Sequence, residues 1–125
     1  MKIHRLLSLC IISLFIISCS KISPEYLQSS YWTGTMISSG EDQMPNDLSF
    51  EFERGKATFT YLPYGEQNPE KGVMRYNISD NKMTIQNANE VLNGIWTVTK
   101  ENKEMLILTR NVEDQVYTIS LHKRR

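Results

Sequence analysis

The chain has 125 residues, enough for one domain and too few for two. Its 14 basic residues balance its 14 acidic ones, so the formal net charge is zero and we expect no nucleic-acid partner. The chain has two histidines and two cysteines, and one of each, His4 and Cys10, lies close to the start. The other histidine and the other cysteine, His122 and Cys19, are too few for a metal site with several histidine or cysteine ligands.

Residues 1–18 have the pattern of a secretory signal peptide. Lys2 and Arg5 supply a basic start, and the run from Leu6 to Ile17 is apolar apart from a few small residues. This run is far shorter than the ~20 apolar residues that a membrane-spanning helix needs, and its basic flank is typical of export signals. We predict that residues 1–18 are removed and that the rest of the chain works outside the cytoplasm.

The segment Ile16-Ile17-Ser18-Cys19 resembles the lipobox of bacterial lipoproteins. The resemblance implies that Cys19 is acylated after cleavage behind Ser18, so that the membrane is a partner through this lipid. Two or three acyl chains, at ~0.8 kcal/mol per buried methylene, hold a protein at a membrane almost irreversibly. We expect a location in the cell envelope, at the outer membrane, on its periplasmic or surface side. An ordinary secreted protein with a chance cysteine here is the alternative.

Residues 19–30 are predicted to form a lipidated tether that contains a short helix. The sequence Ser23-Pro24-Glu25 combines a helix cap, a proline at the first helical position and an acid in the first turn. Tyr26 and Leu27 would be the apolar contacts of this helix. A plain extended tether is the alternative.

Residues 31–125 are predicted to form one all-β domain with eight strands. Each predicted strand is rich in threonine, aromatic or branched residues, and each is bounded by Gly, Asn, Asp or Pro. The segments are Tyr31–Ser38, Leu48–Glu53, Lys56–Leu62, Gly72–Ser79, Lys82–Asn87, Asn93–Lys100, Glu104–Arg110 and Gln115–Lys123.

The alternation of apolar residues also predicts how successive strands pair. Short connections place apolar residues opposite one another on one face of each hairpin, and a slip by one residue would undo this match. The predicted pairs are Phe50 with Phe59 across Arg54-Gly55, Tyr76 with Ile85 across Asp80-Asn81, Val98 with Leu106 across Glu101–Lys103, and Leu108 with Tyr117 across Asn111–Asp114.

The opposite face of these strands carries mainly threonine, serine and charged residues. One polar and one apolar face on eight sequential antiparallel strands favour a closed up-and-down barrel, which also removes exposed sheet edges. A two-sheet β-sandwich is the alternative. Because an eight-stranded barrel is only just wide enough for its own side chains, we expect little internal void. Trp32 and Trp96 are expected to pack in this core rather than to form a sugar-stacking platform.

Several short motifs resemble the bacterial lipocalin-like lipoproteins. They are Tyr31-Trp32-Thr33-Gly34, Leu48–Glu53 with the Arg54-Gly55 turn, Asp80-Asn81-Lys82-Met83, Gly94-Ile95-Trp96-Thr97-Val98, Met105–Arg110 and Tyr117–Lys123. The resemblance spans nearly the whole chain after the signal. It implies an eight-stranded calycin-type barrel with a small helix plugging one end.

The sequence offers no catalytic constellation and no cofactor motif. Once His4 leaves with the signal, His122 is the one remaining histidine, and it stands beside a basic C-terminus. A nucleophile would therefore depend on a single base with no evident orienting partner. We expect a non-catalytic binding module without a metal or another cofactor.

The two ends of the predicted barrel differ in loop length and charge. The end that carries the longer connections is acidic, and the end that the tether enters is basic. Long loops on a rigid scaffold commonly carry binding sites. We therefore predict that a small ligand binds at the long-loop mouth. The candidate ligand-binding residues are Met44, Tyr64, Glu41, Asp42 and Glu66.

A protein-interaction role is the alternative function. In this case the domain would be an accessory subunit of an envelope complex that binds its partner through the outer barrel face. Outward-facing apolar residues on three successive strands are the candidates for such a patch. They are Ile95, Met105, Ile107 and Val116.

Overall fold

The computed structural model describes residues 22–40 and 44–124. The predicted signal peptide, the predicted lipidation site Cys19 and two of the predicted ligand-binding residues, Glu41 and Asp42, lie outside the described residues. Within the described part, no helix is long and apolar enough to cross a membrane.

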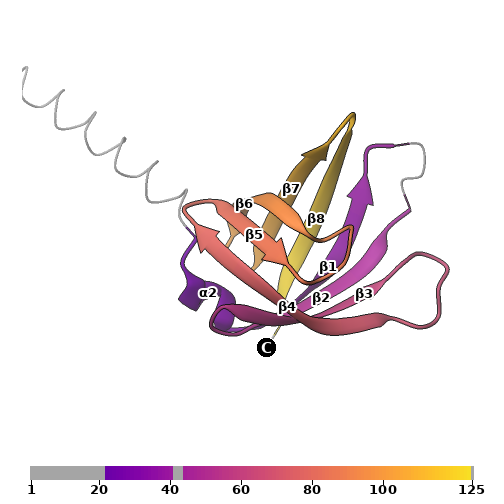
Figure 1. Ribbon diagram of the computed structural model, residues 1–125. Helices are drawn as coiled ribbons and strands as arrows, with labels where there is room; N and C mark the ends of the chain where they lie inside the picture. The colour runs from indigo at the N-terminus through magenta and orange to yellow at the C-terminus, as the bar shows by residue number, and fades with distance from the viewer. Residues whose placement is uncertain (1–21, 41–43, 125) are drawn as a thin grey trace, which may run out of the picture.

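One short helix and eight strands make up the described chain (Figure 1). The elements are α2 (Pro24–Gln28), β1 (Tyr31–Ser38), β2 (Asn46–Phe52), β3 (Lys56–Leu62), β4 (Glu70–Ser79), β5 (Lys82–Gln86), β6 (Gly94–Asn102), β7 (Met105–Val112) and β8 (Gln115–Arg124). Each strand pairs antiparallel with the next, and β8 pairs with β1, so the sheet closes into a barrel. The predicted eight-stranded barrel is confirmed, and the two-sheet sandwich is wrong.

The barrel interior is built by strict alternation along the strands. In β3, Ala57, Phe59 and Tyr61 are buried, whereas Lys56 before them and Thr58 between Ala57 and Phe59 are exposed. Successive side chains of a strand point to opposite faces, so this period of two assigns every residue to the core or to the outer surface. Trp32 and Trp96 are fully buried in the core, as predicted.

The first two predicted hairpins have the predicted register. Phe50 lies opposite Phe59, and Tyr76 lies opposite Ile85. Both hairpins turn through a residue with a positive φ angle, Gly55 at 78° in the first and Asp80 at 55° in the second. Glycine and aspartate tolerate this conformation better than most residues.

The predicted registers of the last two hairpins are wrong by two residues. Val98 lies opposite Leu108 instead of Leu106, because the turn is shorter than predicted and the register shifts between Lys100 and Asn102. The Asn102 side chain accepts a hydrogen bond from the backbone N–H of Glu104, which tightens this turn. A shift of two residues keeps the same side chains inward, so the core is unchanged.

The β7–β8 hairpin differs from its prediction in the same way. Leu108 lies opposite Ile119 instead of Tyr117, because both strands extend to a two-residue turn at Glu113-Asp114. The long connection predicted over residues 111–114 is therefore wrong. The positive φ angle of Glu113, 55°, allows this tight reversal.

Helix α2 closes one end of the barrel. The Ser23 side chain accepts a hydrogen bond from the Tyr26 N–H and caps the helix, and Pro24 occupies its first turn. Leu27 is fully buried, and its carbonyl accepts a hydrogen bond of 3.0 Å from the Trp32 indole. The short N-terminal helix is confirmed, and a plain extended segment is wrong. We call this end the base.

The opposite end, which we call the loop end, is covered by the β5–β6 connection, residues 87–93. Leu92 in this connection is fully buried and belongs to the barrel core. Its carbonyl accepts a hydrogen bond of 2.8 Å from the Trp96 indole. Arg110 reaches back from β7 to donate to the carbonyls of Val91 and Asn93, and its guanidinium lies over the Trp96 ring. Leu27 of α2 at the base and Leu92 of the β5–β6 connection at the loop end therefore pack against the side chains of the barrel interior.

Candidate functional site

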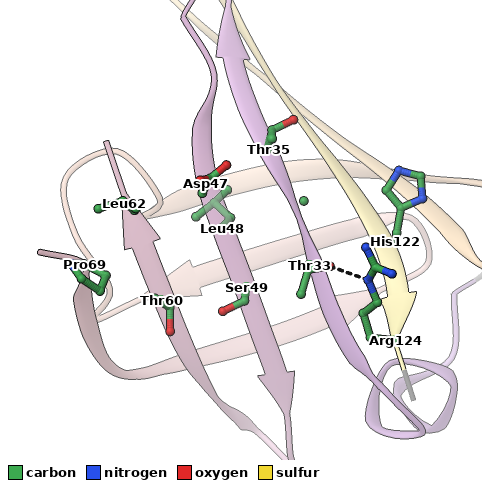
Figure 2. A pocket seen from close by; sticks show the side chains of 11 residues that line it. Thr33, Thr35, Asp47, Leu48, Ser49, Thr60, Leu62, Pro69, His122 and Arg124 are labelled. Atoms are coloured by element: carbon green, nitrogen blue, oxygen red, sulfur yellow. Dashed lines mark hydrogen bonds between the residues drawn. The ribbon is translucent and has the colours of Figure 1, made fainter. Parts of the chain in front are cut away.

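A groove of about 460 Å³ crosses the outer face of the barrel over β8, β1, β2 and β3 (Figure 2). We call it the outer groove. It is lined by Thr33, Gly34, Thr35, Asp47, Leu48, Ser49, Thr60, Leu62, Pro69, His122 and Arg124.

Small hydroxyl side chains form the floor of the outer groove. Thr33, Ser49 and Thr60 lie opposite one another on three adjacent strands. In Figure 2 they lie between Leu62 and Pro69 on one side and His122 and Arg124 on the other. Ser49 is buried although it points outward, which is the effect of lying at the bottom of a hollow. The groove exists because small residues are flanked by larger ones.

Close contact between β1 and β8 places the side of the groove formed by His122 and Arg124 directly beside its floor. Gly34 lies opposite Leu121, and a Cβ atom at Gly34 would lie 1.7 Å from the backbone oxygen of Ser120. Only glycine permits this approach. On the outer side of the same seam, the Arg124 side chain donates to the Thr33 hydroxyl across 3.0 Å.

The lining of the outer groove is suited to hydrogen bonding with a polar partner. Hydroxyls act as donors and acceptors, the Arg124 guanidinium acts as a donor, and the Asp47 carboxylate acts as an acceptor. Among the described residues, no cluster of three or more histidine, cysteine or acidic side chains could hold a metal ion. The groove therefore offers hydrogen-bond donors and acceptors beside apolar groups such as Leu62 and Pro69, and its described residues do not assemble a metal centre.

Two predicted ligand-binding residues come together at the loop end. Met44 and Tyr64 line a surface pocket of about 390 Å³ with Asn46 and Pro63. The Asn46 side chain accepts a hydrogen bond of 2.8 Å from the Tyr64 N–H, which links the first residue of β2 to the β3–β4 loop. Met44 and Tyr64 are 51% and 62% exposed, so the pocket is open to solvent.

Glu66, the third described candidate, lies in the same loop without lining that pocket. Its backbone N–H donates to the Pro63 carbonyl across 3.0 Å and closes a turn. The binding roles of Met44, Tyr64, Glu41, Asp42 and Glu66 stay predictions.

The four outward apolar residues proposed as a patch do not form one surface. Ile95 and Val116 are 61% and 40% exposed near the loop end, while Met105 and Ile107 are half-buried nearer the base. Between the two pairs runs a row of paired threonines, Thr97 with Thr109 and Thr109 with Thr118. The predicted apolar patch is thus divided by polar side chains.

Sequence reasoning missed the outer groove because its residues follow the ordinary pattern of a solvated strand face. One signal was present: a glycine in the middle of a strand often marks a close approach of two backbones. Gly34 is such a residue. The alignment of Thr33, Ser49 and Thr60 depends on the pairing of three strands.

Burial changes the acidity of three tyrosines at the two ends of the barrel. The pKa of the Tyr76 phenol is raised above 10, mainly by burial and also by Glu25, against a hydrogen bond with Gln28 that lowers it. Burial raises the pKa values of Tyr26 and Tyr61 as well, with smaller contributions from nearby carboxylates.

These shifts predict a loss of stability at alkaline pH. Because the folded protein holds these phenol protons more tightly than the unfolded chain, their contribution is complete below pH 10 and falls as the pH rises through the folded pKa values. In urea titrations between pH 9 and about 11, the Tyr76→Phe variant should lose stability less steeply than the wild type. If the free energy of unfolding fell equally steeply with pH in the variant and the wild type, Tyr76 would not contribute to the loss of stability at alkaline pH.

No protein-family model, curated protein or solved structure matches this chain.

Proposed function

We propose that this protein is a lipid-anchored, non-catalytic interaction module of the bacterial cell envelope that binds a protein partner through its outer barrel face. Within this proposal it is a lipocalin-like lipoprotein whose calycin-type barrel serves as a scaffold. Support for the anchor comes from the lipobox-like segment that ends at Cys19.

The observation that carries the choice of surface is that buried side chains occupy the barrel interior and pack at both of its ends. Inward side chains such as Phe50, Met74 and Leu108 are fully buried, α2 packs on the base, and Leu92 packs at the loop end. Sites for small molecules usually enclose most of the ligand surface. The outer groove is open and spans four strands, and its lining combines hydrogen-bonding groups with apolar ones, which suits a protein partner.

A second candidate is the binding of a small ligand at the loop end. The gathering of Met44, Asn46, Pro63 and Tyr64 around one pocket favours it. The exposure of Met44 and Tyr64 leaves a ligand there largely open to water, and this is why we place it second.

The anchor is tested by metabolic labelling with radioactive palmitate. Wild-type protein should incorporate label, and Cys19→Ala should remain uncleaved by the lipoprotein pathway and unlabelled, because the thiol that accepts the lipid is gone. Equal labelling of both proteins would exclude Cys19 as the acylated residue.

Native mass spectrometry of the detergent-extracted protein tests the binding role. A stoichiometric protein partner is expected, and a retained small molecule would favour the second candidate. Thr35→Arg places a large side chain in the outer groove and should reduce the fraction bound. Thr118→Arg is the matched control, because Thr118 is an outward threonine of β8 that does not line the groove. Equal losses for both variants would rule out the groove.

A further inference from the structure

The chain is fixed to the base of the barrel from the first residue that the structure describes. Ile22 is 6% exposed and belongs to the apolar core. Its backbone N–H donates to the carbonyl of Asp80, in the β4–β5 turn, across 3.3 Å. Helix α2 follows at once and packs beneath the barrel, with Leu27 buried. The packed fold therefore begins close behind Cys19.

The spacing between Cys19 and Ile22 limits how far the domain can stand from a membrane. Three residue steps separate the two, and an extended chain covers at most about 3.6 Å per residue. A lipid on Cys19 would hold Ile22 within about 11 Å of the acylated residue. This step rests on the lipid anchor of the proposed function.

Basic residues lie beside Tyr26 of α2 at this same end. The ammonium groups of Lys100 and Lys123 lie over the Tyr26 ring, 4.0 Å and 4.9 Å from its centroid. The Tyr26 hydroxyl donates to the carbonyl of Lys103 in the β6–β7 turn. Lys103 and Lys123 also line a shallow pocket beside Glu104. Three lysines are thus gathered around one helix residue.

The wider base carries both signs of charge. Its described cations are Arg54, Lys56, Arg75, Lys82, Lys100, Lys103, Lys123 and Arg124, and its described anions are Glu25, Glu51, Glu53, Asp80, Glu101 and Glu104. Acidic residues dominate the loop end instead, where Lys71 and Arg110 accompany Asp47, Glu66, Glu70, Glu90, Glu113 and Asp114. Figure 1 shows α2 and the β3–β4 loop on opposite sides of the barrel. Anionic lipids attract the first end and repel the second, within a Debye length of about 8–10 Å.

We infer that the barrel stands on an anionic phospholipid leaflet on its α2 base, with Lys100, Lys103 and Lys123 against the lipid headgroups and the loop end directed away. The short link to Cys19 brings the base to the surface, and the charge difference selects this orientation. The outer groove then runs along the side of a barrel held upright, where a neighbouring envelope protein can reach it.

Spin labels on the lipidated full-length protein in vesicles test this inference. Glu101→Cys labels the base and Glu66→Cys labels the loop end; both positions are exposed, and each variant removes one carboxylate. After signal removal, Cys19 is the only native cysteine. In vesicles containing phosphatidylglycerol at low salt, the base label should be shielded from a neutral water-soluble relaxation agent and the loop label fully accessible.

Two further variants separate the contribution of the lysine charges from that of the short link to Cys19. Replacing Lys100, Lys103 and Lys123 with glutamine should remove the dependence of base shielding on salt and anionic lipid. Inserting roughly twelve Gly and Ser residues between Ser20 and Lys21 adds about 20 Å of reach and should expose the base label in zwitterionic vesicles. Equal accessibility of the two labels in anionic vesicles at low salt would overturn the inference.

The mass of the N-terminal peptide distinguishes the two ways of failing. An unmodified Cys19 removes the anchor of the proposed function and, with it, the argument from the short link. A lipidated Cys19 with equally accessible labels leaves the anchor intact and refutes only the orientation.

Discussion

Replacing Trp96 with alanine is expected to lower the free energy of unfolding by about 3–5 kcal/mol, the usual cost of removing a buried tryptophan. Trp96 is fully buried, and its indole donates to the Leu92 carbonyl across 2.8 Å. The substitution therefore leaves a cavity and removes the contact that holds the β5–β6 connection over the loop end. A loss of this size is a large share of the 5–15 kcal/mol that stabilises an ordinary domain.

The neighbouring Thr97→Ala variant is the control for Trp96→Ala. Thr97 points outward, and its hydroxyl accepts a hydrogen bond of 2.8 Å from Lys82 on the barrel surface. Loss of one exposed hydrogen bond should cost no more than about 1 kcal/mol. Urea midpoints measured side by side would check both values. Similar midpoints for the two variants would contradict the assignment of Trp96 to the core and Thr97 to the surface.

Gly34→Ala is expected to have a comparable or larger effect, because it acts on the seam that closes the barrel. A Cβ atom at this position would lie 1.7 Å from the Ser120 carbonyl oxygen, a backbone atom that cannot rotate away. Strands β1 and β8 must then move apart, and the hydrogen bonds of their ladder are weakened. We expect a loss greater than the ~1–3 kcal/mol typical of overpacking, and a broader unfolding transition.

Gly72→Ala provides a matched comparison within the same barrel. Gly72 also lies within a strand, but a Cβ atom there would meet the ring of Phe59 at 3.0 Å, and a side chain can shift. This variant should be destabilised much less than Gly34→Ala. If thermal or urea unfolding showed the two variants to be equally stable, β1 and β8 would not be held as closely as described.

Patterns local to the chain were sufficient to predict the barrel and its inward face. The alternation in β3 separates Phe59 from Thr58 without reference to any other strand. The helix that closes the base follows from a cap and a proline at Ser23-Pro24, and these act within one turn. The first two hairpins follow from turn residues, Gly55 and Asp80, that tolerate positive φ angles.

The registers of the last two hairpins required the tertiary structure. Pairing Val98 with Leu106 or with Leu108 keeps both leucines inward, because the side-chain period is two. Two registers that differ by two residues therefore have the same apolar pattern, and the sequence pattern does not choose between them. What decides between the alternatives is the turn geometry and the continuation of β7 and β8 to the turn at Glu113.

By itself, then, the sequence determined the elements, their inward faces and the order of the strands, because each depends on neighbouring residues. The tertiary structure alone decided the candidate sites. The outer groove depends on the alignment of Thr33, Ser49 and Thr60 across three strands. Closure of the loop end depends on Arg110. This residue lies on β7, 19 positions after Val91 in the chain, and its side chain donates to the Val91 carbonyl. Contacts between residues distant in sequence have no periodic signal, so they emerge only when the barrel closes.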